Sequence, residues 1–157
     1  MDTLRGLKSV PVFLVIVVCL FSLYLLPSIG FCDDWVYVGS DKESTQYYNS
    51  SSLVIDNQNK KIEVSVKLVF TDKGKINFLE KIDSKTKPKY NDIIYQLKHY
   101  IINYKDMKSN ILFLSYYNKS DKSLFHREYL PKWINIIPDT FIDKLINNIL
   151  KDHNIQR

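Results

Sequence analysis

Alternation of apolar and polar positions is the main pattern of the chain after its first third. From Lys61 to Phe70 every second residue is apolar, with Glu63, Ser65 and Lys67 between them. This period of two predicts a β-strand with one face in a core and the other toward water. The core-facing set is Ile62, Val64, Val66, Leu68 and Phe70.

Shorter segments of the same kind predict further strands on either side of this one. They are separated by short polar loops such as Gly39–Thr45, Asn57–Asn59 and Asn118–Lys122. Strands that follow one another through loops this short pair antiparallel. The predicted segments are Trp35–Val38, Gln46–Tyr48, Ser51–Asp56, Ile93–Tyr104, Asn110–Tyr117 and Ser123–Glu128.

Two segments instead follow the helical period. Gly74–Ile82 is predicted as a short helix that ends before Pro88, with Ile76, Leu79 and Ile82 on one side and Phe78 beside them. A C-terminal helix is predicted after Pro138, starting at Asp139 or Thr140. Its apolar stripe is Phe141, Ile142, Leu145, Ile146, Ile149 and Leu150.

This stripe needs a partner, and the core face of the sheet is the one available. We therefore predict an α+β fold, with an antiparallel β-sheet of about six strands packed against the C-terminal α-helix. A short helix follows the third or fourth strand. Trp133 and the residues up to Pro138 are expected to lie against the sheet, with the Trp133 ring buried.

The N-terminal segment has the pattern of a secretory signal. Arg5 and Lys8 precede an uninterrupted apolar stretch, Val10–Leu26, which Pro27 and small residues follow. We predict that residues 1–32 form a signal peptide and that residues 33–157 form a single α+β domain. The alternative is an uncleaved N-terminal anchor.

Cleavage is predicted between Cys32 and Asp33, and a cut after Gly30 is the alternative site. Phe31 directly before Cys32 is too large for the small position that lipid attachment requires, so no lipid anchor is expected. After cleavage at most one of the 2 cysteines remains. The fold must therefore be held by its core rather than by an intramolecular disulfide.

Charge and composition add little to this picture. The chain has 157 residues, 45% of them hydrophobic, and a formal net charge of +5. Its lysines alternate with acidic and turn residues, which is typical of a solvated surface rather than of a nucleic-acid site. No nucleic-acid partner is expected.

No motif with catalytic or metal-binding spacing is present. His99, His126 and His153 lie far apart along the chain, and no phosphate-binding glycine loop, Gly-x-Ser-x-Gly or Cys-x-x-Cys occurs. The sequence thus predicts no catalytic, cofactor-binding or metal-binding residues, and a protein that is not an enzyme.

Tyrosine is abundant, with 11 residues against 8 phenylalanines. Tyr47-Tyr48 and Tyr116-Tyr117 are adjacent pairs on predicted strands, so one ring of each pair should face the core and the other should face outward. Exposed tyrosines suit binding to a partner, although packing within the sheet is the favoured role.

Several segments together resemble the surface-adhesin protein E family of small exported bacterial proteins. They are Asp34-Trp-Val-Tyr-Val-Gly39, Tyr47–Leu53, Glu63–Phe70, Tyr95–Asn103, Ser115-Tyr-Tyr-Asn118 and Trp133–Thr140. The resemblance spans essentially the whole of the predicted mature chain. It implies the same α+β fold and a place at the cell envelope.

The resemblance also implies a function and one departure from the family. Members are known as surface proteins that adhere to host proteins. Where relatives carry two cysteines, this chain has Tyr104 and Leu150, which implies an apolar contact in place of a bridge. We expect these two side chains to pack together.

The sequence therefore supports a non-enzymatic, exported binding module with another protein at the cell surface as its partner and no cofactor. It would reside in the periplasm, at the cell surface or outside the cell, and would touch the membrane only through an uncleaved N-terminal segment. The alternative is a periplasmic structural or small-ligand-binding protein. An exposed patch of tyrosine and lysine would favour the first, and a deep apolar cavity the second.

Overall fold

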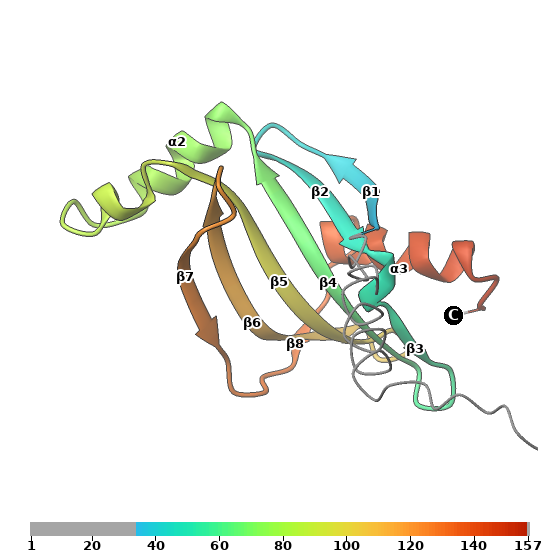
Figure 1. Ribbon diagram of the computed structural model, residues 1–157. Coiled ribbons are helices and arrows are strands. Elements are labelled where there is room, and N and C mark those ends of the chain that lie inside the picture. Colours follow the sequence, from blue (N-terminus) through green and yellow to red (C-terminus); the bar gives the residue numbers. More distant parts are fainter. Residues whose placement is uncertain (1–33, 157) are drawn as a thin grey trace, which may run out of the picture. The chain divides into compact units, whose positions relative to one another are not determined.

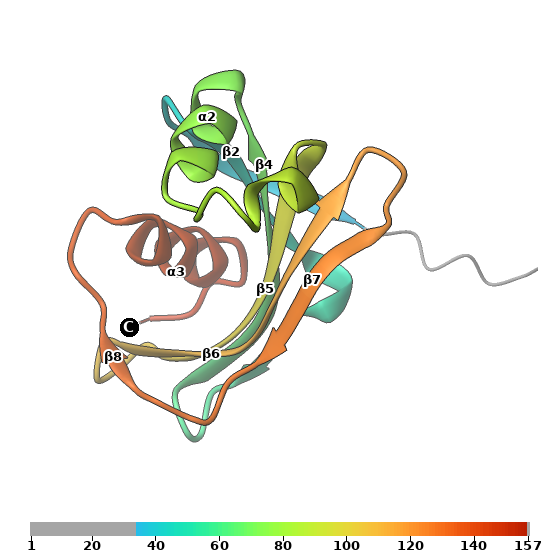
Figure 2. The ribbon, with the colours of Figure 1, turned by 90° about the vertical axis from the view of Figure 1, so that its left-hand side faces the viewer.

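A curved antiparallel sheet with a helix, α3, against its concave side organises residues 34–156, which are the residues that this computed structural model describes (Figures 1 and 2). The predicted signal segment and the cleavage site at Cys32 and Asp33 lie outside this range and stay predictions. Within it, no helix is long and apolar enough to cross a membrane.

The sheet has eight strands, and the main path runs in the order β1-β2-β4-β5-β6-β7. Two short strands lie off this path, because β3 pairs with β4 and β8 pairs with β6. The strands are β1 Trp35–Ser40, β2 Ser44–Asn49, β3 Val54–Asp56, β4 Lys61–Phe70, β5 Ile93–Asn103, β6 Lys108–Asn118, β7 Ser123–Glu128 and β8 Ile134–Asn135. The helices are α2 Asp72–Glu80 and α3 Phe141–Asp152, with short 3-10 helices η1 Ser50–Ser52 and η2 Lys87–Tyr90.

The core lies between the concave face of the sheet and α3, as predicted. The inward residues Ile62, Val64 and Val66 of β4 are fully buried and belong to one cluster with the apolar stripe of α3, while Leu68 is partly buried against it. This cluster includes Ile62, Val64, Val66, Tyr100, Ile102, Leu145, Ile146 and Ile149. The expected α+β fold is confirmed. The strand β8, which is two residues long, was not predicted.

The strand predicted from Ser51 to Asp56 is only half present. Asn49 ends β2 and its side-chain oxygen accepts hydrogen bonds from the backbone N–H groups of Ser51 and Ser52, at 2.9 and 3.2 Å. This caps the helical turn η1, so the extended chain resumes only at β3. Serine and asparagine side chains offer the backbone such local partners, which outweighed the strand pattern here.

The short helix α2 is present, but the placement of Ile76 on its inner side is wrong, because Ile76 is 57% exposed. Phe78, Leu79 and Ile82 are half-buried. The Phe78 ring makes the contacts to the sheet, with its centroid 5.4 Å from that of Phe70 and 5.0 Å from that of Tyr116. Gly74 is buried because its Cα lies against the Glu43 backbone carbonyl, where a Cβ atom would collide. The close approach of this backbone sets the orientation of α2.

The prediction that Trp133 is buried is also wrong, since its side chain is 45% exposed. The residue that the segment inserts into the core is Ile136, which belongs to the core cluster. Tyr104 and Leu150, expected to lie near each other, are both buried in that same cluster. In so short a segment, the pattern of apolar and polar residues does not show which apolar side chain will face the core.

Candidate functional site

The convex face of the sheet carries the molecule's main group of aromatic and polar side chains outside the core. In Figure 2, α3 lies on the concave side of the sheet, and the short teal helical turn on the opposite side is η1. Because side chains alternate along a strand, Glu63, Ser65 and Lys67 of β4 face this convex side while their neighbours face the core. We call it the convex face throughout.

Lys67 lies at the centre of the aromatic part of this face. Its ammonium nitrogen is 4.1 Å from the ring centroid of Trp35 and 5.0 Å from that of Tyr95. Both distances are within the range of cation–π attraction. Tyr95 also stacks on Tyr117, with centroids 4.9 Å apart and the rings inclined by 13°. The lysine therefore joins rings from β1 and from β5.

Two more tyrosines extend the aromatic surface toward the β1 edge. The Tyr37 and Tyr47 rings meet edge to face at 6.0 Å, and Tyr37 is 57% exposed. Each adjacent tyrosine pair divides between the two faces as predicted, since Tyr48 belongs to the core cluster and Tyr116 contacts Phe78, while Tyr47 and Tyr117 lie on the convex face. The outward rings were predicted from strand alternation alone.

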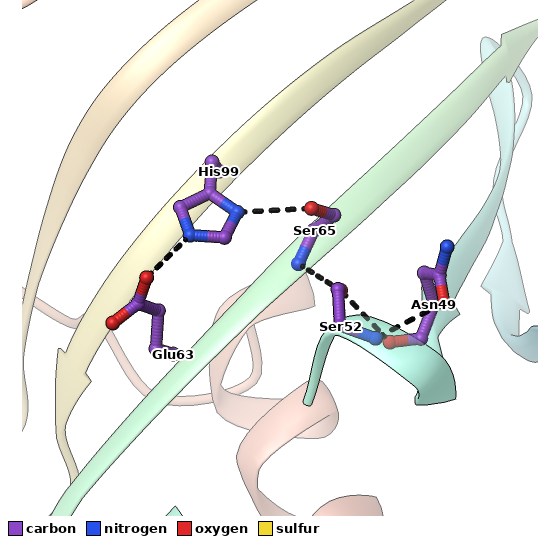
Figure 3. Close-up of polar contacts among 5 residues, drawn as sticks. All are labelled: Asn49, Ser52, Glu63, Ser65 and His99. Atoms are coloured by element: carbon purple, nitrogen blue, oxygen red, sulfur yellow. Dashed lines mark hydrogen bonds and ion pairs between the residues drawn. The ribbon is translucent and has the colours of Figure 1, made fainter. Parts of the chain in front are cut away.

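A hydrogen-bonded group of Glu63, His99 and Ser65 lies beside the aromatic rings (Figure 3). His99 Nε2 is 2.8 Å from Glu63 Oε1, and His99 Nδ1 is 2.9 Å from Ser65 Oγ. A carboxylate accepts and does not donate, so the Nε2 atom holds the proton, and in the neutral ring Nδ1 accepts the Ser65 hydroxyl. The group ties β4 to β5 across the convex face.

The same part of the face depends on η1 (Figure 3). Pairing of β4 with β2 ends at Val66, and pairing with β3 begins at Glu63, so Ser65 has no strand partner on that side. The Ser52 hydroxyl fills the gap by accepting the Ser65 backbone N–H at 3.0 Å. A buried N–H without a partner costs free energy, so this contact replaces a missing strand bond.

A second histidine repeats the pattern on the other side of Phe113. His126 Nδ1 is 2.7 Å from Ser115 Oγ, and its Nε2 is 3.9 Å from Glu128. The Phe113 ring stacks on His99 at 5.3 Å and lies 5.7 Å from His126. One aromatic ring thus lies between two histidines that are 27 positions apart in the sequence. No local sequence motif predicts this arrangement.

Serine, histidine and a carboxylate are also the side chains of serine hydrolases, but the arrangement lacks the other parts of such a site. An acyl-transfer enzyme needs N–H donors aimed at the developing oxyanion. Here the Ser65 backbone N–H is already donated to Ser52. Ser65 also stands in the middle of a strand, on the face of a sheet. The contacts of Ser65 and Glu63 with His99 join β4 to β5.

The third histidine of the chain, His153, is exposed at the end of α3. Its backbone N–H is bonded to the Ile149 carbonyl. Between residues 34 and 156 no group of three potential metal ligands occurs. The sequence missed the partners of His99 and His126, which come from neighbouring strands. To predict these partners, one would need the strand register, which places Ser65 opposite His99 and Ser115 opposite His126.

Titratable groups on the concave side are shifted by burial. Burial raises the pKa of the Tyr100 phenol far above its usual range, and that of Tyr116 in the same direction. The pKa of Tyr48 is raised by burial and then by its hydrogen-bonded partner Asp152 in α3. Burial lowers the pKa of Lys98. These groups report on packing beneath the helices rather than on a site open to a ligand.

A cavity of about 250 Å³ lies at the turn between β5 and β6, lined by Asn103, Asp106, Lys108 and Trp133. Three of its four lining residues are polar or charged. It is therefore not the deep apolar pocket that a small-ligand-binding protein would show.

Comparisons with known proteins point to one group of solved structures. No protein-family model and no curated protein matches the chain. A structure of Haemophilus influenzae protein E is similar, with 13% identity and a TM-score of 0.45, covering 68% of this chain and 77% of that one. A second crystal form has 14% identity and a TM-score of 0.45, covering 69% and 82%.

Protein E from non-typeable Haemophilus influenzae is similar as well, with 14% identity, a TM-score of 0.44, and coverage of 74% of this chain and 78% of that one. Identities this low concern the fold alone. All three of these similar structures are structures of protein E.

Proposed function

We propose that this chain is a non-enzymatic, exported binding module of the cell envelope and that it binds another protein through the convex face. The observation that carries the proposal is the continuous group of rings around Lys67, contributed by β1, β2, β5 and β6. Tyrosine and tryptophan bring large contact areas with few rotatable bonds, and they are enriched among the residues that dominate binding energy.

The hydrogen-bonded groups on the same face support this role. Contacts among Glu63, His99 and Ser65 hold neighbouring strands in register, so the rings are displayed on a prearranged surface. A surface that is ordered before binding loses less conformational entropy when the complex forms. The aromatic rings would supply affinity, and Lys67 would favour a partner with acidic groups at its centre.

The small-ligand alternative has less support. The space between the sheet and α3 is filled by apolar side chains of the core cluster, including Leu145 and Ile149. The cavity beside Trp133 is small and mostly polar. Two observations were to separate these functions, a surface patch of tyrosine and lysine or a deep apolar cavity. The half-exposed rings around Lys67, together with the exposed Tyr37, favour binding of a macromolecule.

Adhesion of beads that carry residues 33–157 to a panel of immobilised extracellular proteins tests the proposal. We expect the double variant Tyr37→Ala, Tyr117→Ala to lose at least about tenfold of the adhesion, on the scale of one removed hot spot. The matched control is Ile76→Ala, another exposed apolar side chain, in α2. Unchanged adhesion of the double variant, or no adhesion by the native domain, would contradict the proposal.

Export is tested separately by fractionating cells that produce the tagged full chain and sequencing the N-terminus of the product. A mature chain that starts at Asp33 in an extracytoplasmic fraction is expected. A chain that keeps Met1 in the cytoplasm would contradict export, whatever the result of the adhesion measurement.

A further inference from the structure

The cavity at the turn between β5 and β6 combines an aromatic ring with hydrogen-bonding side chains. Its volume is about 250 Å³, and it is lined by Asn103, Asp106, Lys108 and Trp133. Sites for small ligands usually combine apolar and aromatic surface with a few placed polar groups, and sites for drug-sized ligands start at about 300 Å³. The cavity therefore has the size for a ligand of one ring.

The polar part of the cavity is built on an ordered turn. The Asn103 side-chain oxygen accepts the backbone N–H groups of Lys105 and Asp106, at 3.1 and 2.9 Å. The Asn103 amide nitrogen donates to one carboxylate oxygen of Asp106 at 2.8 Å. Asn103 and Lys108 are opposite each other where β5 pairs with β6. The Asp106 carboxylate is thus held in place without a ligand, which lowers the entropy cost of binding.

The backbone that carries Trp133 is fixed on both sides of this residue. Before it, the N–H of Lys132 donates to the side-chain oxygen of the buried Asn110, at 3.1 Å. After it, β8 pairs with the start of β6, where Asn135 is opposite Lys108. The Trp133 side chain itself remains exposed. A large ring is therefore displayed beside the turn and stays accessible to a ligand.

The lining also keeps hydrogen-bonding capacity of both kinds. Within residues 34–156, no partner is found for the Lys108 ammonium, for the Trp133 indole N–H or for the second carboxylate oxygen of Asp106. An ammonium and an indole only donate hydrogen bonds, and an ionised carboxylate only accepts them. A ligand that fits this cavity has to supply donors and acceptors together.

A sugar ring has this chemistry. Each hydroxyl of a pyranose donates one hydrogen bond and accepts others, so neighbouring hydroxyls can satisfy both Lys108 and Asp106. The C–H groups on one side of the ring form an apolar patch that can stack on the indole face of Trp133. An apolar ligand would instead leave the charged groups without partners. A calcium ion takes six to eight oxygen ligands, far more than one carboxylate supplies.

We propose that this cavity binds one pyranose ring of a saccharide, with the ring stacked on Trp133 and its hydroxyls bonded to Asp106 and Lys108. Asn103 would act as a positioning residue, because its side chain holds the Asp106 carboxylate. The site shares no residue with the aromatic group around Lys67. The proposal therefore does not depend on protein binding by the convex face.

Nuclear magnetic resonance of residues 33–157, which form one compact unit, tests the proposal. The chain has 2 tryptophans and thus two indole N–H signals, and Trp133→Phe identifies the signal of Trp133. The probes are the methyl glycosides of glucose, galactose, mannose and N-acetylglucosamine. At least one should shift the Trp133 signal to saturation, with a dissociation constant on the order of 1 mM for a ligand of this size. The signal of Trp35, whose ring lies against Lys67, is the internal reference and should not move.

Substitutions in the lining should weaken this binding. Asp106→Asn keeps the shape of the side chain and should weaken it at least about tenfold, the scale of one lost hydrogen bond to a charged group. Trp133→Ala should abolish it, as followed by the backbone amide signal of Lys108. The matched controls are Lys105→Ala in the same turn and Leu130→Ala near Trp133, two exposed side chains that do not line the cavity. Both should bind like the native domain.

The convex-face variant Tyr37→Ala, Tyr117→Ala should also bind the glycoside normally, which separates this site from the proposed protein-binding surface. No shift with any of the four glycosides would overturn the proposal, as would equal weakening by Lys105→Ala and Asp106→Asn. A shift caused by zwitterionic alanine but by none of the glycosides would overturn it as well, because the cavity would then select a pair of opposite charges.

Discussion

Adjacent residues of β4 experience opposite environments. Val64 is fully buried in the cluster that α3 closes, whereas Ser65 faces the convex side and is bonded to His99 and Ser52. The concave face is thus stabilised by apolar area, which needs no particular geometry. The convex face is organised by directional hydrogen bonds and ring contacts, which position side chains while leaving them accessible. The concave face thus stabilises the fold, and the convex face presents the side chains that we propose bind a partner.

The largest effect is expected on the concave side. Leu145→Ala in α3 should lower the free energy of unfolding by about 2–5 kcal/mol, because it removes a fully buried side chain and leaves a cavity. Urea denaturation measures the loss. The control Ile76→Ala removes an exposed side chain and should cost less than about 0.5 kcal/mol. A loss below about 1 kcal/mol for Leu145→Ala would show that α3 does not close the core.

A backbone contact at the end of the sheet comes next. Gly74→Ala places a methyl group against the Glu43 carbonyl, and a shift of α2 is needed to admit it. We expect a loss of about 1–3 kcal/mol, as for overpacking in a core. Helix propensity alone would make the same change favourable. A stabilised variant in thermal denaturation would therefore show that the two backbones are not in close contact.

On the convex side a single hydroxyl should be measurable. Ser52→Ala leaves the Ser65 backbone N–H without its acceptor and should cost about 1–2 kcal/mol. Ser50→Ala, in the same helical turn, removes an exposed contact to the Asp34 carbonyl and should cost less than about 0.5 kcal/mol. Equal losses for both variants would mean that Ser52 stabilises η1 in general rather than the gap beside β4.

The two faces should also differ in their response to alkaline pH. Burial raises the folded-state pKa of Tyr100, so the unfolded chain loses this proton first as the pH rises past about 10. The stabilisation is present below that pH and is lost as the pH climbs toward the folded-state value. Tyr100→Phe should flatten the decline of stability above pH 10 in urea titrations. Parallel declines in the native protein and the variant would contradict the assignment.

The smallest effect is expected in the segment between β7 and α3. Trp133→Ala should change the free energy of unfolding by less than about 1 kcal/mol, although it removes a larger side chain than Leu145→Ala, because the ring is 45% exposed. Thermal denaturation of the two variants makes the comparison. A loss of about 3 kcal/mol or more would place Trp133 in the core.

Strong periodic patterns predicted the parts of the fold that burial dictates. The strand Lys61–Phe70 is present with the predicted bounds, and the α3 stripe contributes Leu145, Ile146 and Ile149 to the core. Patterns over a few residues failed where local bonds or neighbours competed. The Asn49 side chain caps η1 where a strand was predicted. Ile76 is exposed, and Ile136 rather than Trp133 lies in the core.

By itself, the sequence determined the antiparallel sheet, the covering helix and the division of each adjacent tyrosine pair between the two faces, because alternation and helical period record which side of an element meets water. Only the tertiary structure decided which side chains meet across strands. Ser65 is 34 positions from His99, and the register that joins them arises from pairing along the whole of β4 and β5. The contacts of the convex face therefore could not be read from the sequence. A one-residue slip in register would turn the side chains that make them toward the core.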